Sequence, residues 1–230
     1  MGSAAGRCLA ARGHTVLWAS QGRGPQTAER ARSCGLHDVG TAAAMARQAD
    51  VIFSVGPPHA ALKVAGSVRG FRGTYVDANA VSPQTARDVA TIVEGGGSGY
   101  VDGGIIGPPP VSTGSSRLYL SGPAAGSVRS LFDGTALDAR LVQGDIGSAS
   151  SVKMAYAAWT KGSAALLLAV RALADAQGVS DVLVAEWELS RRPRSSASMA
   201  GPRQQEPSKS PAQRPLIGPR ATTGYSPEYV

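Results

Sequence analysis

Short apolar runs alternate with amphipathic stretches over the first 145 residues, a pattern typical of a parallel sheet with helical crossovers. The clearest run, Val51 to Val55, is continuously apolar and ends at Gly56-Pro57-Pro58, as expected of a strand buried on both faces. Other strands are predicted at 15–18, 74–77, 99–102, 117–120 and 139–142, and helices at 26–33, 42–48, 60–68 and 124–132, with a further helix start at Ser82-Pro83.

The chain opens on an Ala-rich helical stretch that leads directly into the apolar run at 15–18. In a dinucleotide-binding βαβ unit, a strand and a Gly-x-Gly-x-x-Gly turn come before that helix. Here only the last of those glycines, Gly2, has a counterpart. The pattern therefore predicts an α/β fold with a Rossmann-like, mostly parallel sheet that lacks its first strand and is N-terminally truncated.

The pattern changes after residue 145. Residues 151–177 form one long apolar-rich stretch closed by Gly178, which predicts a helix buried nearly all round, between domains or subunits. Ser180 is placed to begin a further helix. From Arg191 the chain holds seven of the 15 prolines and little apolar periodicity, so residues 191–230 are expected to be a disordered basic Pro/Ser-rich tail. Truncation or a shifted reading frame would also explain that tail.

The composition argues against a nucleic-acid-binding module and a membrane-spanning protein. The tail carries seven Lys and Arg against two Glu, and so accounts for +5 of the net charge of +7; this leaves no basic surface typical of a nucleic-acid module. No run is long enough to span a membrane, and no signal peptide is evident. Cys8 and Cys34 are expected to be small buried residues, which favours a reducing, cytoplasmic setting. His14, His37 and His59 show no metal-ligand spacing, and His37 is expected in a turn.

Five segments together resemble the β-hydroxyacid dehydrogenase superfamily, which includes 6-phosphogluconate and 3-hydroxyisobutyrate dehydrogenases and imine reductases. The similarity is closest to a subgroup with a short phosphogluconate dehydrogenase-like C-terminal domain. The segments are Ala-Arg-Gly-His-Thr-Val (11–16), Ala-Asp-Val-Ile-Phe-Ser-Val-Gly-Pro-Pro (49–58), Tyr-Val-Asp-Ala-Asn-Ala-Val-Ser-Pro (75–83), Asp-Gly-Gly-Ile-Ile-Gly-Pro-Pro-Pro (102–110) and Gly-Asp-Ile-Gly-Ser-Ala-Ser-Ser-Val-Lys (144–153).

The resemblance implies hydride transfer between a nicotinamide cofactor and a small hydroxy acid or a related carbonyl or imine. It implies an NAD(P)-binding domain over 1–145, part of an all-helical domain over 146–190, and a homodimer. The family's catalytic lysine matches Lys153. A lysine also suits the chemistry, because an amine in a cleft can take the proton that a hydroxyl loses as hydride leaves, or stabilise the oxyanion. The alternative is a solvated lysine on a helix face.

Substrate contacts are expected at Gly103, Gly104, Ile106 and Tyr156. Two positions depart from the family pattern: Ala157 stands where an Asn is expected, and Ile106 where a Ser is expected. Tyr156 and Trp159 could supply a hydroxyl or a stacking wall, or could simply pack in an interface. These residues suggest a larger and less polar pocket than that of the hydroxy-acid enzymes.

The cofactor is expected to be NADP, with NAD as the alternative. No acidic residue follows the strand at 15–18 to bind ribose hydroxyls; instead Ser20 and Arg23 suit a 2′-phosphate. Nicotinamide contacts are expected at Val55, Gly56 and Pro57, with Asn79 beside the ring and Gly2 at the pyrophosphate. Ordinary strand-end and loop chemistry is the alternative for each of these positions. No metal is expected.

Two other classes of function stay open at this stage. A truncated, catalytically silent dehydrogenase-like protein would keep the fold but lose cofactor affinity with the missing turn. A basic-tailed adaptor would instead act through residues 191–220.

Overall fold

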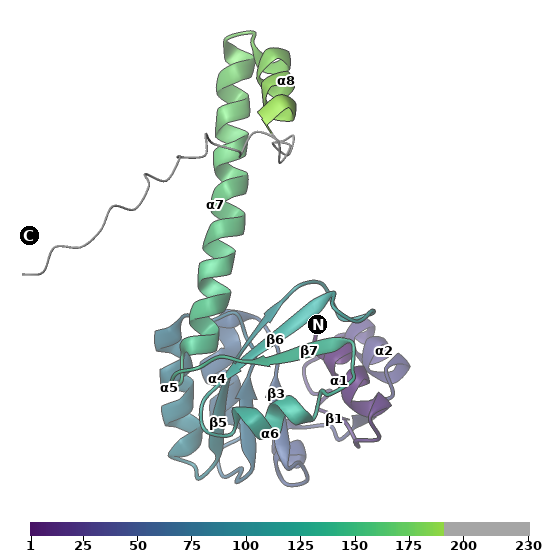
Figure 1. Cartoon of the computed structure of the whole chain (residues 1–230). Coiled ribbons are helices and arrows are strands. Elements are labelled where there is room, and N and C mark those ends of the chain that lie inside the picture. The colour runs from purple at the N-terminus through teal and green to yellow at the C-terminus, as the bar shows by residue number, and fades with distance from the viewer. Residues whose placement is uncertain (191–230) are drawn as a thin grey trace, which may run out of the picture. The chain divides into compact units, whose positions relative to one another are not determined.

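The computed structural model describes residues 1–190, and its strands form two parallel-rich sheets (Figure 1). A short sheet pairs β1 (Leu17–Trp18) with β2 (His37–Asp38) in parallel. The larger sheet has the order β3-β4-β5-β6-β7, and only the β5–β6 pair is antiparallel. Its strands are β3 (Val51–Ser54), β4 (Thr74–Asp77), β5 (Gly99–Ile106), β6 (Ser116–Ser121) and β7 (Leu137–Leu141). The predicted Rossmann-like α/β class is confirmed.

Helices connect the strands, and local capping explains where several of them begin. The Ser82 hydroxyl accepts the Thr85 amide at 3.1 Å, and Pro83 follows it, so α5 begins where the sequence predicts. Thr41 caps α3 in the same way through the Ala44 amide. The helices are α1 (Gly2–Ala11), α2 (Pro25–Ser33), α3 (Ala42–Ala46), a 3-10 turn η1 (Pro58–Ala60), α4 (Ala61–Ser67), α5 (Pro83–Glu94), α6 (Ala125–Ser130), α7 (Ser148–Ala176) and α8 (Ser180–Ser190).

The larger sheet is covered on both faces, which produces two apolar cores. On one face, side chains of α1 and α6 pack with alternate residues of β4, β5 and β6, among them Val76, Val101 and Leu118. On the other face, α4 and α5 pack against the residues between, among them Tyr75 and Tyr100. Burial on both faces explains why the strands read as nearly continuous apolar runs.

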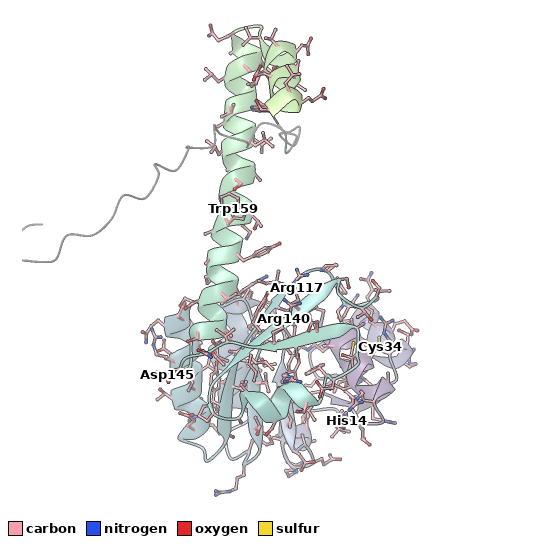
Figure 2. All side chains as sticks on the ribbon, in the orientation of Figure 1. His14, Cys34, Arg117, Arg140, Asp145 and Trp159 are labelled. Atoms are coloured by element: carbon pink, nitrogen blue, oxygen red, sulfur yellow. The ribbon has the colours of Figure 1, made fainter. Side chains whose placement is uncertain are left out.

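Three local expectations are wrong. His37 lies in β2 and not in a turn, because a two-residue strand is too short to give a periodic signal. Cys34 is only half-buried, since it lies just past the end of α2; Cys8 is buried as expected. The long helix is not buried nearly all round in this chain: Trp159, on α7, is 73% exposed (Figure 2).

The chain divides into two compact units, residues 1–173 and a second that begins at Ala174. The first contains both sheets and most of α7; within it the apolar residues Tyr156, Leu166, Leu167 and Leu168 are also exposed. No helix within residues 1–190 has the length and apolar character needed to cross a membrane. The predicted tail over 191–230 lies outside the described residues, and the domain boundary expected at residue 145 stays a prediction.

Candidate functional site

A cavity of about 1220 Å³ lies between β1 and β3, and its lining includes residues that follow the carboxyl ends of both strands. The chain leaves β1 toward β2 and leaves β3 toward β4 on the opposite side, so the cavity lies where the strand order reverses. Open α/β sheets bind their ligands at this kind of position. Of the cofactor residues expected from the sequence, the lining includes Gly2, Arg23, Val55, Gly56, Pro57 and Asn79.

The side chain of Asn79 holds the Gly56 loop, and both residues line the cavity. Its side-chain oxygen accepts the Gly56 amide, and its side-chain nitrogen donates to the Ser54 hydroxyl at 3.0 Å. The Asn79 backbone amide donates in turn to Asp77 at 2.9 Å. Asn79 is 3% exposed, so its polar groups are used to fix the Gly56 loop. The loop is thereby held in a single arrangement beside the cavity.

Gly2 and Arg23 both line the cavity. Gly2 is the first residue of α1, and a β-carbon added there would lie 3.6 Å from the β-carbon of Val55. This places the first turn of α1 beside the end of β3, where helix amides favour a negative charge. Arg23 lies in the loop after β1, and within residues 1–190 no ion pair involves its guanidinium.

Ser20 is arranged differently from the expectation. It is absent from the residues that line the cavity. Instead it lies beside Asp38, where the Gly40 amide and, secondarily, the Ser20 hydroxyl lower the pKa of that carboxyl. The structure therefore leaves Arg23 as the expected 2′-phosphate ligand that faces the cavity.

Close backbone approach explains the two glycines of β5. A β-carbon on Gly103 would lie 3.0 Å from the Asp77 carbonyl oxygen of the neighbouring strand. On Gly104 it would lie 3.0 Å from both the Ala149 carbonyl oxygen and the Lys153 β-carbon. The first turns of α7 thus lie directly on β5, and any side chain larger than hydrogen at Gly104 would push Lys153 away.

Lys153 is half-buried on the second turn of α7. Burial lowers the pKa of its ammonium below the ordinary lysine value, and the positive charge of Lys161 lowers it further. Ile106, also expected near the substrate, is buried, whereas Tyr156 is 44% exposed. Neither Lys153 nor Tyr156 lines the cavity between β1 and β3. Lys153 therefore lies against Gly104, and the residues expected to bind the cofactor lie together at the cavity. The structure does not bring these two groups of residues into one lining.

Asp102, which the sequence interpretation did not single out, holds the start of α7. One carboxylate oxygen accepts the amides of Gly147 at 3.0 Å and Ser150 at 2.9 Å, and the Ser121 hydroxyl at 3.2 Å. The other accepts the Ser150 hydroxyl at 2.6 Å. These are charge-assisted bonds at a helix N-terminus, where amides have no helical partner. Asp102 is fully buried, and it fixes the helix that carries Lys153.

A polar row crosses four adjacent strands beside Asp102. The ladder pairs Ser54 with Asp77, Asp77 with Asp102, and Asp102 with Ser121. Unlike Asp102, Asp77 has one buried carboxylate oxygen without a hydrogen-bond partner. Burial raises the pKa of Asp77 to about 6, opposed by hydrogen bonds from Asn79 and assisted by the charge of Asp102. The signal in the sequence is a repeat, Tyr-Val-Asp at 75–77 and again at 100–102, which the ladder aligns residue by residue.

The histidines and cysteines contribute no cluster. Within residues 1–190, no three His, Cys, Asp or Glu side chains come together in a way that could hold a metal ion. His14 and His37 are exposed, and His14 also lines the cavity. His59 lies in η1.

Comparison with known proteins supports the fold. No protein-family model matches the chain. An uncharacterised 28.5 kDa protein of Methanothermus fervidus is 28% identical over 165 residues, which are 71% of this chain and 63% of that protein. The chain therefore spans less than two thirds of that relative's length.

The chain is also similar in structure to several proteins whose structures have been solved. A conserved protein of unknown function, described as structurally similar to 3-hydroxyacid dehydrogenases, is 28% identical with a TM-score of 0.67, over 82% of this chain and 71% of that one. An imine reductase of Myxococcus stipitatus in complex with NADP+ is 24% identical with a TM-score of 0.65, over 83% and 68%. A variant of that enzyme is described with NAD+.

Together with 3-hydroxyisobutyrate dehydrogenase and reductive aminase structures, these matches identify the fold class. The chain has the fold of the β-hydroxyacid dehydrogenase superfamily, and the resemblance found in the sequence is confirmed.

The Asp102 bonds generate a first prediction. Asp102→Asn should lower the free energy of unfolding by about 3 kcal/mol, because an amide NH₂ would face buried N–H donors that then lose their acceptor. Chemical denaturation measures this, and amide exchange at Ser150 should quicken. The matched control is Asp145→Asn: Asp145 is exposed and lies just before α7 (Figure 2), so the change should stay within about 0.5 kcal/mol. Equal losses in both variants would contradict the role of Asp102.

The Asp77 carboxyl generates a second prediction. Its pKa rises on folding from 3.8 to about 6, so the folded state holds the proton more tightly. Stability from this group is therefore present below pH 4 and is lost as the pH rises to 6, by about 3 kcal/mol. Asp77→Asn should remove this loss and be more stable than the unmodified chain at pH 8.

Urea denaturation at pH 4.5 and at pH 8 measures the difference. Asp181→Asn, which changes an exposed carboxylate at the start of α8, should leave the pH dependence as it is. An unchanged pH profile in Asp77→Asn would show that Asp77 ionises normally.

Proposed function

We propose that this protein is an NAD(P)-dependent oxidoreductase that transfers hydride between a nicotinamide cofactor and a small hydroxy acid or a related carbonyl or imine. The observation that carries the proposal is the cavity at the point where the strand order reverses, lined by Gly2, Arg23, Asn79 and the 55–57 loop. Solved relatives of the same fold are described in complex with NADP+, NAD+ or NADPH. The whole protein's activity is inferred here from a chain that spans part of its relatives.

The residues present fit a nicotinamide dinucleotide. Gly2 and the first turn of α1 would meet the pyrophosphate, and Arg23 would pair with a 2′-phosphate as a fork of donors. Val55, Gly56 and Pro57 would border the nicotinamide, on a loop that Asn79 holds in place. When bound, that ring supplies or accepts the hydride.

The lysine would handle the proton. As a CH–OH group loses hydride from carbon, its hydroxyl proton passes to the Lys153 amine, which leaves a carbonyl and an ammonium; the reverse step returns the proton. This requires a neutral amine at the start, and burial with the charge of Lys161 lowers the pKa of Lys153 in the required direction. Gly103, Gly104, Ile106 and Tyr156 would then border the substrate.

A catalytically silent dehydrogenase-like protein is the second candidate. The specific observation in its favour is that Lys153 and Tyr156 do not line the cavity, whereas most of the residues expected to bind the cofactor do. Binding of cofactor without turnover of any hydroxy acid, carbonyl or imine would favour this candidate.

A second copy of the chain is the partner we infer for α7. Trp159, Leu166, Leu168 and Leu173 present apolar side chains that are 65–73% exposed. Exposed apolar side chains in such number are typical of an interface. A cytoplasmic location stays a prediction from composition.

The lysine is tested with a matched pair on the same helix. In Lys153→Ala, hydride transfer should fall by about 10²–10⁴-fold, because the proton acceptor is lost, while NADPH affinity measured by nicotinamide fluorescence stays the same. Lys161→Ala should keep turnover and raise the pH at which activity is half-maximal, since a positive neighbour of Lys153 is removed. Turnover that survives in Lys153→Ala would dismiss the lysine, and no NADPH binding at millimolar concentration would dismiss the enzyme proposal for this chain.

Cofactor preference is tested at Arg23. Arg23→Ala should weaken NADPH binding by about ten- to a hundredfold, because a charge-assisted pair with the 2′-phosphate is lost, and should leave NADH binding as it is. Arg32→Ala is the control, since Arg32 pairs with Glu29 and does not line the cavity. An equal loss for NADH and NADPH would contradict recognition of the 2′-phosphate by Arg23.

A further inference from the structure

One face of β5 and β6 lies beside the first turns of α7. Successive side chains of a strand point to opposite faces of the sheet, and Leu118 and Leu120 pack in the core with α6. Ser121 points to the other face, where its hydroxyl accepts the amide of Ala149 in α7 at 3.0 Å. We call this the α7 face, which consists of residues 102, 104 and 106 of β5 and residues 117, 119 and 121 of β6.

The strand register brings Arg117 close to Lys153 on this face. The ladder pairs Gly104 with Tyr119, and Ile106 with Arg117. Arg117 is thus the diagonal neighbour of Gly104, and such positions lie about 7–8 Å apart across an antiparallel pair. A β-carbon on Gly104 would lie 3.0 Å from that of Lys153. The side chains of Lys153 and Arg117 therefore start from neighbouring positions on one face.

Arg117 also lies at the edge of the sheet where ligands bind. Because β6 runs antiparallel to β5, the start of β6 lies beside the carboxyl end of β5 (Figure 2). Nη1 of Arg117 donates to the Gly114 carbonyl at 3.2 Å, which holds the guanidinium next to the loop that joins the two strands. The carboxyl ends of the strands are where open α/β sheets bind their ligands.

The charge of Arg117 is not neutralised within residues 1–190, since no ion pair there includes it. Asp138 lies opposite Arg117 in the β6–β7 ladder, but its Oδ2 binds Arg140, 2.6 Å from Nη2 and 2.8 Å from Nε. Asp102 is fully buried on the same face, and its oxygens accept donors of α7 and β6. A guanidinium has five N–H donors, so Arg117 has donors available for an anion.

The other side chains of the α7 face near Arg117 offer no second charge. Ile106, directly opposite Arg117, is 3% exposed and apolar. Tyr119, opposite Gly104, is half-buried, as is Arg117 itself. A cation that is partly removed from water and lies beside apolar side chains attracts an anion more strongly than a fully solvated one.

We propose that Arg117 binds a carboxylate of the substrate, and that a short carbon chain separates this carboxylate from the carbon that exchanges hydride. The inference rests on the proposed function, because the reacting carbon is placed at Lys153. The separation between Gly104 and Arg117 gives the length, and Ile106 supplies an apolar surface for the chain between the two ends. The guanidinium matches the two oxygens of a carboxylate, whereas a neutral ketone or imine would leave it unused.

The first test measures binding and needs neither cofactor nor turnover. The probes are 4-oxopentanoate and its ethyl ester, which share one ketone and differ by one negative charge. At millimolar concentration the acid should shift the backbone NMR signals of Ile106 and Arg117 more than the ester does. Arg117→Leu should weaken binding of the acid by about tenfold or more and leave the ester as it is. Arg117→Lys should restore part of the affinity, because it restores the charge without the fork of donors.

Arg69→Leu is the matched control. Arg69 is an exposed arginine in the segment before β4, and so it lies at the opposite, amino edge of the sheet. The substitution removes the same charge from the protein and should change the affinity for 4-oxopentanoate by less than about twofold. A loss equal to that of Arg117→Leu would overturn the proposal, because net charge alone would then explain the binding.

The second test measures reduction of the same probes with NADPH. Arg117→Leu should lower kcat/KM for 4-oxopentanoate by about ten- to a hundredfold, mainly through KM, and leave that for the ester unchanged. An equal loss for acid and ester would overturn the proposal, because a purely structural role would affect both. Pyruvate, whose carboxylate is bonded directly to the carbonyl carbon, should be reduced less well than 4-oxopentanoate, and the opposite order would overturn the proposed separation.

Failure of the enzyme proposal has a separate signature. Binding of the acid that Arg117→Leu abolishes, without NADPH binding, would support the carboxylate site and contradict the enzyme. Binding of NADPH without any preference for the acid over the ester would contradict the carboxylate site and leave the enzyme proposal standing.

Discussion

The fully buried carboxylate of Asp102 is the interaction on which the candidate site depends. It accepts two backbone amides and two hydroxyls, and three of those four donors belong to the turn and first residues of α7. The Ala149 amide adds a bond to the Ser121 hydroxyl at 3.0 Å, so strand β6 also takes part. A buried charge is stable only with such donors, and the donors are satisfied only while the charge is there. Helix and sheet are therefore fixed together, and Lys153 with them.

The adjacent strands β4 and β5 bring the carboxyl groups of Asp77 and Asp102 into the same buried row. The two carboxyl groups differ in their hydrogen-bond donors, and therefore in how readily each one ionises. Asp102 has a full set of donors, whereas Asp77 has one satisfied oxygen and one without a partner. Neighbouring buried carboxylates disfavour double ionisation, so the proton belongs on the poorly solvated member. The stacked rings of Tyr75 and Tyr100, with centroids 6.4 Å apart, cover this row from the amino side and keep water out. The pKa of Asp77 follows from that exclusion.

Much of the fold could be predicted because its signals are local. Continuous apolar runs mark β3 and β4, and Ser82-Pro83 marks the start of α5. The placement of Gly2, Asn79 and the 55–57 loop at one cavity also follows from the sequence, since the carboxyl ends of parallel strands meet at one edge of a sheet.

The rest depends on contacts between distant residues. Asp102 and Ser150 are 48 positions apart, so no local pattern joins the carboxylate to the helix it holds. Ser20 looks like a phosphate ligand in its own segment, but the fold brings Asp38 beside it from the next strand. The apolar composition of α7 predicts burial, and a single chain cannot show which surface provides it. For the polar row, the signal in the sequence is the repeated Tyr-Val-Asp segment, which occurs at 75–77 in β4 and at 100–102 in β5.

The cavity and the lysine lie apart, yet a continuous series of contacts connects them. Lys153 lies on Gly104, two residues beyond Asp102 on the same face of β5, and Gly103 approaches the Asp77 carbonyl on β4. Asp77 holds the Asn79 amide, and Asn79 holds the Gly56 loop at the cavity mouth. Each step is a close backbone approach or a hydrogen bond of the buried Asn79, and such tightly packed contacts do not deform easily. The β4–β5 pair thus connects Lys153 with the Gly56 loop, and Asp77, whose pKa is raised to about 6 by burial, lies within this series of contacts.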